Sequence, residues 1–235
     1  MGRPVPDAEQ QRKLDLLEAI PHDLVIGIDE VGCGPLAGPV TVGGVVVRRG
    51  WDHPMVLDSK ALSPKRRKES VDVIMGAALA HVILSLEAPA LDAEGIIAAR
   101  ERLTREVALH LSQKFEAVVV QDGSVPAPVP GRDRTNMVWL AKADALVPAV
   151  SAASILAKVW RDTEMVNYHE IFPYYFWQAN KGYGTKAHYA GLEKYGPCVL
   201  HRFSYKPIRD LAKRLGLKEY AHRCTGPLAP TRGDR

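Results

Sequence analysis

The sequence predicts an α/β fold with a mixed sheet, and three observations lead to this prediction. Two strand-like segments, 24–29 and 39–48, are joined by a turn too short for a crossover, which indicates an antiparallel pair. After them, strand-like segments alternate with helix-like ones, as in sheets that contain parallel strands. Hydrophobic residues make up 46% of the 235 residues and charged residues 25%, which is typical of a soluble globular protein.

The predicted strands are short runs of apolar and β-branched residues, the composition of buried strands. The first, LVIGID, leads into an acidic pair, and the turn Gly32-Cys33-Gly34-Pro35 follows. The fourth, AVVVQ, stops at Asp122-Gly123. In chain order, the predicted strands are 24–29, 39–48, 81–87, 117–121 and 136–141.

The predicted helices follow from apolar periodicity and from residues that favour helix ends. Ser63 and Pro64 are the residue types expected at an N-cap and in a first turn. The Pro- and Gly-rich segment 123–134 predicts a loop, and the chain from about residue 222 predicts a frayed tail. The predicted helices are 8–19, one that begins after Ser63, 92–113 and 150–168.

Composition also limits the class of protein. No run approaches the roughly 20 apolar residues of a membrane span, and the polar start lacks a secretory signal, so we expect a cytoplasmic protein. The three cysteines, Cys33, Cys198 and Cys224, are too scattered for a disulfide framework or a zinc knuckle. The formal charge of +4 permits a polyanionic partner but does not require one.

Four acidic residues stand where predicted strands end or a helix begins. Asp29 and Glu30 follow the first strand, Asp122 follows the fourth, and Asp144 precedes the last helix. If these strands are neighbours, the carboxylates meet at one edge of the sheet, where ligands bind in open sheets. Divalent cations such as Mg²⁺ would relieve their repulsion and could flank a scissile phosphodiester. Each residue taken singly could instead form a turn or a helix cap.

The glycine-rich turn has two interpretations. Gly32, Gly34 and Gly38 resemble a dinucleotide-binding turn, but that motif requires a following helix, and a β-branched run follows Pro39 instead. The neighbouring acidic pair would also repel an anionic cofactor. We therefore interpret the turn as a backbone loop that approaches a ligand closely, beside metal-binding carboxylates.

Five segments in the same order resemble the motifs of type II ribonucleases H. IGIDEVGCGPLAGPVTVGGVVV is similar to the opening motif, LDSKALSPKRR to the Asp-Ser-Lys segment, and VVVQDG to the strand that ends in Asp-Gly. KADALVPAVSAASILAKVWRD resembles the long central block, and NKGYGTKAHYAGLEKYGPCVLHRFSY resembles the closing motifs. The resemblance covers about residues 24–208.

The resemblance implies an RNase H-like fold: a central mixed five-stranded sheet flanked by helices, with a C-terminal helical segment. It divides the chain into an N-terminal helical extension (1–20), a catalytic domain (21–206) and a C-terminal helix with a flexible tail (207–235). It implies an endonuclease that cuts the RNA strand of RNA–DNA hybrids, or 5′ to single ribonucleotides in duplex DNA, as in ribonucleotide excision repair. The products would carry 3′-hydroxyl and 5′-phosphate ends, and a monomer is expected.

The resemblance also implies a role for individual residues. The backbone of the glycine loop would contact a ribose 2′-hydroxyl, the group that distinguishes RNA from DNA, and Tyr183 would pack on the ribonucleotide. Tyr183 could equally be a core residue, and each lysine a solvated surface charge. Two divalent ions, Mg²⁺ or Mn²⁺, would be held during catalysis by Asp29, Glu30, Asp122 and Asp144. The other substrate-binding residues implied are Gly32, Cys33, Gly34, Ser59, Lys60, Lys158 and Lys186.

One residue departs from the family pattern, which has Arg where this chain has Cys33. If only the backbone reads the 2′-hydroxyl, the difference costs little. If the Arg side chain binds a phosphate or orders the acidic strand end, its loss removes a charge-assisted contact of about 1.5–3 kcal/mol. We therefore expect a reduced affinity or rate and the same reaction.

Two alternative functions are compatible with parts of the sequence. The first is another nuclease of the RNase H fold, such as a junction resolvase, and the Tyr183 motif argues against it. The second is a catalytically weak duplex-binding protein whose loop is damaged at Cys33, and the complete set of four acidic residues argues against that.

Overall fold

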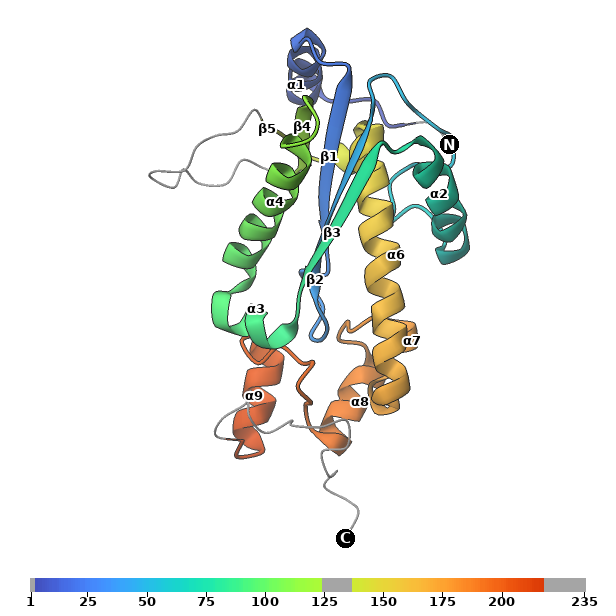
Figure 1. The fold of residues 1–235 in the computed structure, drawn as a ribbon. Coiled ribbons are helices and arrows are strands. Elements are labelled where there is room, and N and C mark those ends of the chain that lie inside the picture. Colours follow the sequence, from blue (N-terminus) through green and yellow to red (C-terminus); the bar gives the residue numbers. More distant parts are fainter. Residues whose placement is uncertain (1–2, 124–136, 218–235) are drawn as a thin grey trace. The chain divides into compact units, whose positions relative to one another are not determined.

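The structure of the protein is a computed structural model that describes residues 3–123 and 137–217. Within these residues, five strands form one sheet in the order β3-β2-β1-β4-β5 (Figure 1). β1 pairs parallel with β4, and β4 pairs parallel with β5. β1 and β2 are neighbours joined by residues 32–39, too few for the crossover of a parallel pair, so they run antiparallel and the predicted mixed sheet is confirmed. The strands are β1 Leu24–Val31, β2 Val40–Arg48, β3 Ala80–Leu86, β4 Val118–Asp122 and β5 Met137–Leu140.

The helices follow the predictions for the first part of the chain. Ser63 is the N-cap of α2 and accepts a hydrogen bond from the backbone N–H of Arg66, with Pro64 as the first helical residue. The helices are α1 Ala8–Ala19, α2 Pro64–Ala77, α3 Ala88–Glu94, α4 Ile96–Ser112, α5 Ala143–Leu146, α6 Pro148–Ile171, the 3₁₀ helix η1 Pro173–Tyr175, α7 Trp177–Asn180, α8 Lys186–Tyr195 and α9 Lys206–Arg214.

The prediction of one helix over 92–113 is wrong. The structure has two helices there, α3 and α4, which meet at Gly95. Gly95 has φ 86°, a left-handed conformation that ends α3 and that glycine adopts without a steric penalty. The helix α8 was not predicted, although Thr185 caps it and Gly196 ends it. The predicted loop at 124–134 and the predicted tail lie outside the described residues, as does Cys224.

The described residues group into two compact units, which we name by their main content. The sheet unit comprises the described parts of 1–31, 42–84 and 102–159, and the C-terminal unit those of 32–41, 85–101 and 160–235. The division of the chain into an N-terminal extension, a catalytic domain and a C-terminal segment remains a prediction.

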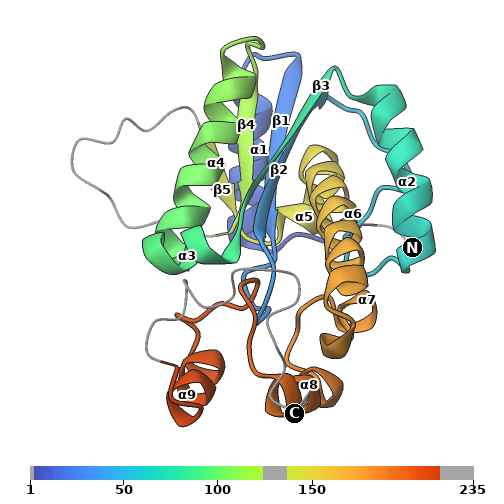
Figure 2. The same cartoon turned by 60° about the horizontal axis from the view of Figure 1, so that its bottom comes forward.

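In the sheet unit, helices lie on both faces of the sheet (Figure 2). Two successive glycines of β2 point to opposite faces, and their neighbours identify the helix that covers each face. A Cβ on Gly43 would lie 2.7 Å from the Ala153 oxygen of α6, whereas one on Gly44 would lie 2.3 Å from Val107 of α4. In β1, a Cβ on Gly27 would lie 2.1 Å from the backbone carbon of Ala149. The backbone of α6 therefore packs directly against the sheet, because glycines face it there.

The C-terminal unit has its own core of apolar and aromatic side chains. Tyr175 and Trp177 stack with their ring centroids 4.9 Å apart, and the edge of Tyr175 meets His201 at 4.6 Å. Leu36 and Ala37 of the glycine-rich loop belong to the same core. This core anchors the loop from one side.

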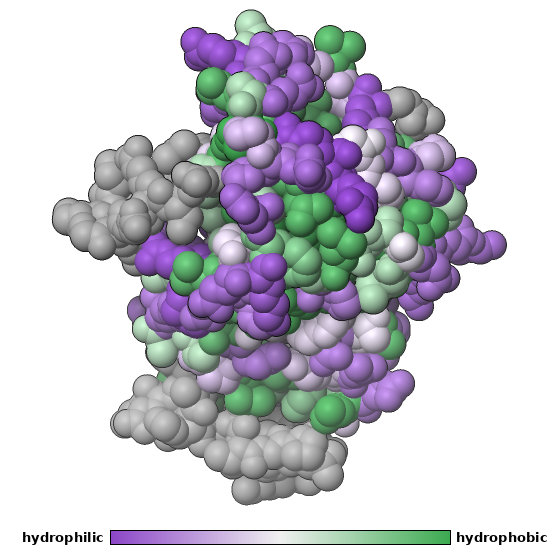
Figure 3. Space-filling model, turned by 45° about the horizontal axis from the view of Figure 1, so that its top comes forward, coloured by the Kyte–Doolittle hydropathy of each residue, from purple (hydrophilic) through white to green (hydrophobic). Residues whose placement is uncertain are grey.

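In the part of the chain that the structure describes, no helix is both long enough and apolar enough to cross a membrane. On the face drawn in Figure 3, hydrophilic and hydrophobic residues are interspersed.

Candidate active site

The first two acidic residues lie at the ends of neighbouring parallel strands. Ile28 of β1 is in register with Gln121 of β4, so the next residue of each strand, Asp29 and Asp122, lie side by side. In-register residues of parallel strands face the same side of a sheet, and here that is the α6 side. Asp29 is only 4% exposed. Successive strand residues alternate, so Glu30 faces the other side, where its carboxylate accepts a hydrogen bond from Gln121 at 3.2 Å.

Asp144 reaches the same edge of the sheet by a turn. β5 runs parallel to β4, and Lys142 then adopts a left-handed conformation with φ 59° before α5 begins. The Asp122 carboxylate accepts a hydrogen bond from the backbone N–H of Ala143 at 2.6 Å. Asp144 is buried in the first turn of α5.

The electrostatics show that the four carboxylates form one group. The pKa of Asp29 is raised well above its ordinary value, first by burial and then by the negative charge of Glu30. The charges of Asp122 and Asp144 raise it further. Burial and the charge of Asp144 also raise the pKa of Asp122. Carboxylates from three separate stretches of sequence therefore act electrostatically on one another, and their joint role as a catalytic and metal-binding set remains a prediction.

Two buried serines form a chain of hydrogen bonds that ends at the Asp29 carboxylate. The hydroxyl of Ser154, on α6, hydrogen bonds to the Asp29 carboxylate and lowers its pKa in part. Ser154 Oγ lies 2.9 Å from Ser59 Oγ. Ser59 is thus placed in a hydroxyl pair that orients Asp29, and its contact with phosphate remains a prediction. Sequence reasoning missed Ser154, whose small side chain fits the face of α6 that packs on the sheet.

Lys60 is the cation of this group. Its Nζ lies 2.9 Å from Asp144 Oδ2, while 76% of the side chain is exposed. Partial desolvation lowers the pKa of Lys60, but the hydrogen bond to Asp144 and the charges of Asp144 and Asp29 outweigh it and raise the pKa to about 12. Lys60 therefore stays protonated and can reach from Asp144 toward solvent.

The donor set fits a hard divalent cation. All the groups that converge here are oxygen donors, the ligands that Mg²⁺ and Mn²⁺ prefer. The buried Oε1 of Gln121, beside Glu30, has no hydrogen-bond partner among the residues that the structure describes. As the side chains stand, the described residues contain no group of three or more His, Cys, Asp or Glu arranged to hold a metal ion. The charges of Glu30, Asp122 and Asp144 near the buried Asp29 create an excess of negative charge that a cation would neutralise.

In the C-terminal unit, two buried arginines shape the glycine loop. Arg202 donates to the carbonyl oxygens of Gly32 at 2.6 Å and Cys33 at 3.1 Å. Arg161 donates to the carbonyl oxygen of Pro39 at 2.8 Å. Both arginines are fully buried. Burial, and then the charge of Arg202, lower the pKa of Arg161 to about 10, so Arg161 remains cationic at neutral pH. Burial also lowers the pKa of Arg202.

Two glycines of the loop lie where a larger residue would approach a neighbouring side chain. At Gly32 that neighbour is Arg161, and at Gly34 it is Tyr183. Gly32 has φ 90°, and a Cβ there would lie 2.3 Å from Arg161 Nε. A Cβ on Gly34 would lie 3.6 Å from the Tyr183 ring. The Tyr183 side chain is 46% exposed, and its backbone oxygen is 2.9 Å from His188 Nδ1. The ring is therefore held at the surface of the C-terminal unit beside Gly34 and is not a core residue.

The remaining predicted lysines lie on helices. Lys158 is half-buried on α6, and Lys186 is exposed in the first turn of α8. Their role in phosphate binding stays a prediction.

The family model described as Ribonuclease HII matches residues 26–208. The chain belongs to the ribonuclease HII family. It is 38% identical over 191 residues to the ribonuclease HII of Lactobacillus helveticus (strain DPC 4571), a match that covers 81% of this chain and 74% of the relative. The family consists of ribonucleases H, so the protein is an endoribonuclease that hydrolyses phosphodiester bonds.

Solved structures confirm the fold expected of a ribonuclease HII. Ribonuclease H2 from Pyrococcus horikoshii OT3 aligns with a TM-score of 0.65 at 22% identity and covers 83% of this chain and 99% of its own. Bst-RNase HIII, solved in complex with Mn²⁺, aligns with a TM-score of 0.65 at 20% identity and covers 86% and 73%. The RNase H-like fold implied by the sequence motifs is thus confirmed.

The family motifs of the sequence contain Arg161 and Arg202, but the sequence alone assigns neither residue a role. Most of the acceptors that hold the loop are backbone carbonyls far away in sequence: Arg161 bonds Pro39, 122 residues before it, and Arg202 bonds Gly32, 170 residues before it. No residue type marks such a carbonyl. The sequence around either arginine therefore carries no signal of this role.

Proposed function

We propose that this enzyme is an endonuclease that hydrolyses the RNA strand of RNA–DNA hybrids and cuts 5′ to single ribonucleotides embedded in duplex DNA. The products would carry 3′-hydroxyl and 5′-phosphate ends. The single observation that carries the proposal is the convergence of Glu30, Asp122 and Asp144 on the buried Asp29. Buried carboxylates with raised pKa values are concentrated at functional sites.

In this proposal, Asp29, Glu30, Asp122 and Asp144 hold two divalent ions, Mg²⁺ or Mn²⁺. Bound divalent ions activate water and stabilise negative charge on a scissile phosphate. The all-oxygen donor set and the unpartnered Oε1 of Gln121 support this. The complex of Bst-RNase HIII with Mn²⁺, a protein of the same fold, also supports it.

The residues of the chain then have separate tasks. Asp29 is fixed by Ser154, which Ser59 orients in turn. Asp122 is fixed by the backbone N–H of Ala143. Such supporting hydrogen bonds keep metal ligands in a productive orientation. Lys60, protonated and largely exposed, would meet the phosphate backbone of the duplex.

Recognition of the ribose is assigned to the C-terminal unit. Gly32, Cys33 and Gly34 would approach the 2′-hydroxyl through the backbone, and Tyr183 would pack against the sugar. The proposal is supported by the absence of a side chain at Gly34 next to the exposed Tyr183 ring. Arg161 and Arg202 would keep the loop rigid, because they hold its carbonyl oxygens.

A cleavage assay on paired substrates tests the proposal. One duplex carries a single ribonucleotide in DNA and the other is a long RNA–DNA hybrid, each assayed with Mg²⁺, with Mn²⁺ and with EDTA. We expect metal-dependent cleavage of both substrates and none in EDTA. Asp122→Asn should abolish cleavage and keep duplex binding, whereas Asp72→Asn, at an exposed carboxylate on α2, should change neither. Full activity of Asp122→Asn would remove Asp122 from the site, and cleavage in EDTA would exclude the metal-dependent mechanism.

A further inference from the structure

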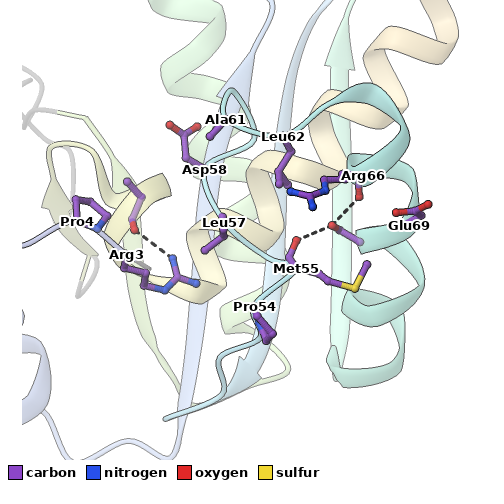
Figure 4. A pocket seen from close by; sticks show the side chains of 12 residues that line it. Arg3, Pro4, Pro54, Met55, Leu57, Asp58, Ala61, Leu62, Arg66 and Glu69 are labelled. Carbon is purple, nitrogen blue, oxygen red and sulfur yellow. Dashed lines mark hydrogen bonds between the residues drawn. The ribbon is translucent and has the colours of Figure 1, made fainter. Parts of the chain in front are cut away.

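The N-terminal segment reaches the turn that carries Asp144, although it precedes the region 26–208 that matches the family. The Arg3 guanidinium donates to the carbonyl oxygen of Ala145 at 3.2 Å and to Ser151 Oγ at 2.9 Å (Figure 4 draws Arg3 and its bond to this turn). Ser151 Oγ donates in turn to the carbonyl oxygen of Asp144 at 2.7 Å. Arg3 is thus linked to the backbone of Asp144 through two hydrogen bonds, with Ser151 between them. It also bonds directly to Ala145, the residue after Asp144.

Arg3 is itself firmly held. Its other terminal nitrogen donates to Val56 O at 2.9 Å and to Asp52 Oδ1 at 2.8 Å. Its side chain is 16% exposed. A planar guanidinium that bonds acceptors on two sides fixes their separation, which a lysine ammonium does less well. Arg3 therefore ties the turn of Asp144 to the segment 52–56.

A second N-terminal residue contacts the other end of the same turn. Gln10 Nε2 donates to the carbonyl oxygen of Ala141 at 2.9 Å. Gln10 is positioned by the capping box at the start of α1, in which its own side chain and that of Asp7 bond the backbone. The two N-terminal side chains therefore bracket the turn, at Ala141 and at Ala145.

The bracketed turn is one that needs external support. Lys142 adopts φ 59° although it is not glycine. Such a conformation is disfavoured for a residue with a Cβ, and it persists where surrounding contacts impose it. Asp144 lies two residues further on, so any relaxation of Lys142 would move its carboxylate.

We propose that Arg3, with Gln10, is a positioning residue for Asp144: the N-terminal segment clamps the strained turn at 141–145 and sets the position of this carboxylate. The inference rests on the proposed role of Asp144 in catalysis. Arg3 does not touch the substrate or the reacting atoms, and it acts through Ala145, Ser151 and the backbone of Asp144.

The test compares full-length variants Arg3→Ala, Arg3→Lys and Gln10→Ala with the matched control Arg49→Ala. Arg49 also donates to backbone carbonyls, those of Leu17, Ile20 and His22, and so ties down the end of α1. Three quantities are measured: hydrogen–deuterium exchange of peptides covering 141–147 without metal, calorimetric binding of Mn²⁺ without substrate, and kcat and KM for the single-ribonucleotide duplex.

For Arg3→Ala we expect faster exchange at Ala145 and Val147, whose N–H groups close the turn. We expect Mn²⁺ affinity and kcat to fall about 10-fold, the usual effect of removing a residue that orients a metal ligand, with KM for the duplex unchanged. Arg3→Lys should recover part of the loss, and Gln10→Ala should show a smaller effect in the same direction. Arg49→Ala should lower the melting temperature but leave exchange at 141–147 and kcat as in the wild type.

Two results would overturn the inference. One is exchange at 141–147 and Mn²⁺ affinity in Arg3→Ala equal to those of the wild type. The other is the same change in Arg49→Ala, which would indicate general destabilisation. The variant Asp144→Asn separates the failure of this inference from the failure of the proposed function. If Asp144→Asn keeps full activity, Asp144 is not catalytic. If Asp144→Asn is inactive while Arg3→Ala behaves as the wild type, only the clamp is rejected.

Discussion

The carboxylate group of the sheet unit and the arginine pair of the C-terminal unit both bury like charges, but they are stabilised in opposite ways. Burial, and then the charges of the neighbouring carboxylates, raise the pKa of Asp29. Arg161 and Arg202 are surrounded by carbonyl oxygens, which accept their hydrogen bonds. A buried charge whose hydrogen-bonding groups all have partners can stabilise the fold, as the two arginines do. A buried charge whose neighbours carry the same sign is unfavourable by itself and indicates a site that binds an ion of opposite charge.

The largest effect on the cleavage rate is expected from a substitution within the carboxylate group. Asp29→Asn should lower cleavage by at least about 10³-fold, since losses of this order follow removal of a single catalytic donor. The same variant should be more stable than the wild type without metal, because a buried negative charge among like charges is removed. A gain of about 1 kcal/mol corresponds to roughly 2–4 °C in Tm for a chain of this size. Initial rates and thermal unfolding measure both, and a lower Tm would contradict the account of Asp29.

The opposite result is expected for the arginine pair. Arg202→Met should destabilise the protein by about 1–3 kcal/mol for each carbonyl oxygen left without a donor. These are the oxygens of Gly32 and Gly38, whereas the oxygen of Cys33 keeps its bond from the Tyr205 hydroxyl. Denaturant unfolding measures the loss. Arg209→Met serves as control, since Arg209 is exposed on α9 and should cost little. A loss below about 1 kcal/mol for Arg202→Met would show that water replaces the guanidinium.

A substitution in the glycine loop is expected to have a smaller effect, on duplex binding or on the cleavage rate. Cys33→Arg restores the family residue and should tighten duplex binding or raise the rate by about 10-fold, the equivalent of one charge-assisted contact. The backbone oxygen of Cys33 is already held by Arg202, so the loop should keep its shape. Cys33→Ala is the matched control and should behave as the wild type. Equal affinity and rate for all three proteins would show that the backbone alone reads the sugar.

The smallest expected effect is on the pH dependence of stability without metal. The folded-state pKa of Asp29 is above its unfolded value, so the folded state binds the proton more tightly. This contribution to stability is present below the unfolded pKa of about 3.8 and is lost as pH rises through the folded pKa. The wild type should therefore lose stability relative to Asp29→Asn over this range, and added Mn²⁺ should remove the difference. Parallel curves for the two proteins would contradict this.

The sequence predicted the positions of the four carboxylates because strand ends and an adjacent acidic pair are local features. Burial of β1 and β4 followed from their apolar runs, and the parallel register then places Asp29 beside Asp122. The break at Gly95 was missed because helical periodicity continues on both sides of it. The roles of Ser154 and Arg202 depend on which distant backbone and side-chain atoms the fold brings near, and no local pattern encodes this.

Gly27 and Gly43 also limit how this protein can be engineered. Replacing glycine with alanine often raises stability, because it restricts the unfolded chain. At Gly27 the added methyl would lie 2.1 Å from the backbone of Ala149, and at Gly43 2.7 Å from that of Ala153. Helix α6 would have to move away from the sheet, and Ser154 would move with it. A search for heat-resistant variants should therefore leave both glycines unchanged and look instead at Gly76, which has open space around it on α2.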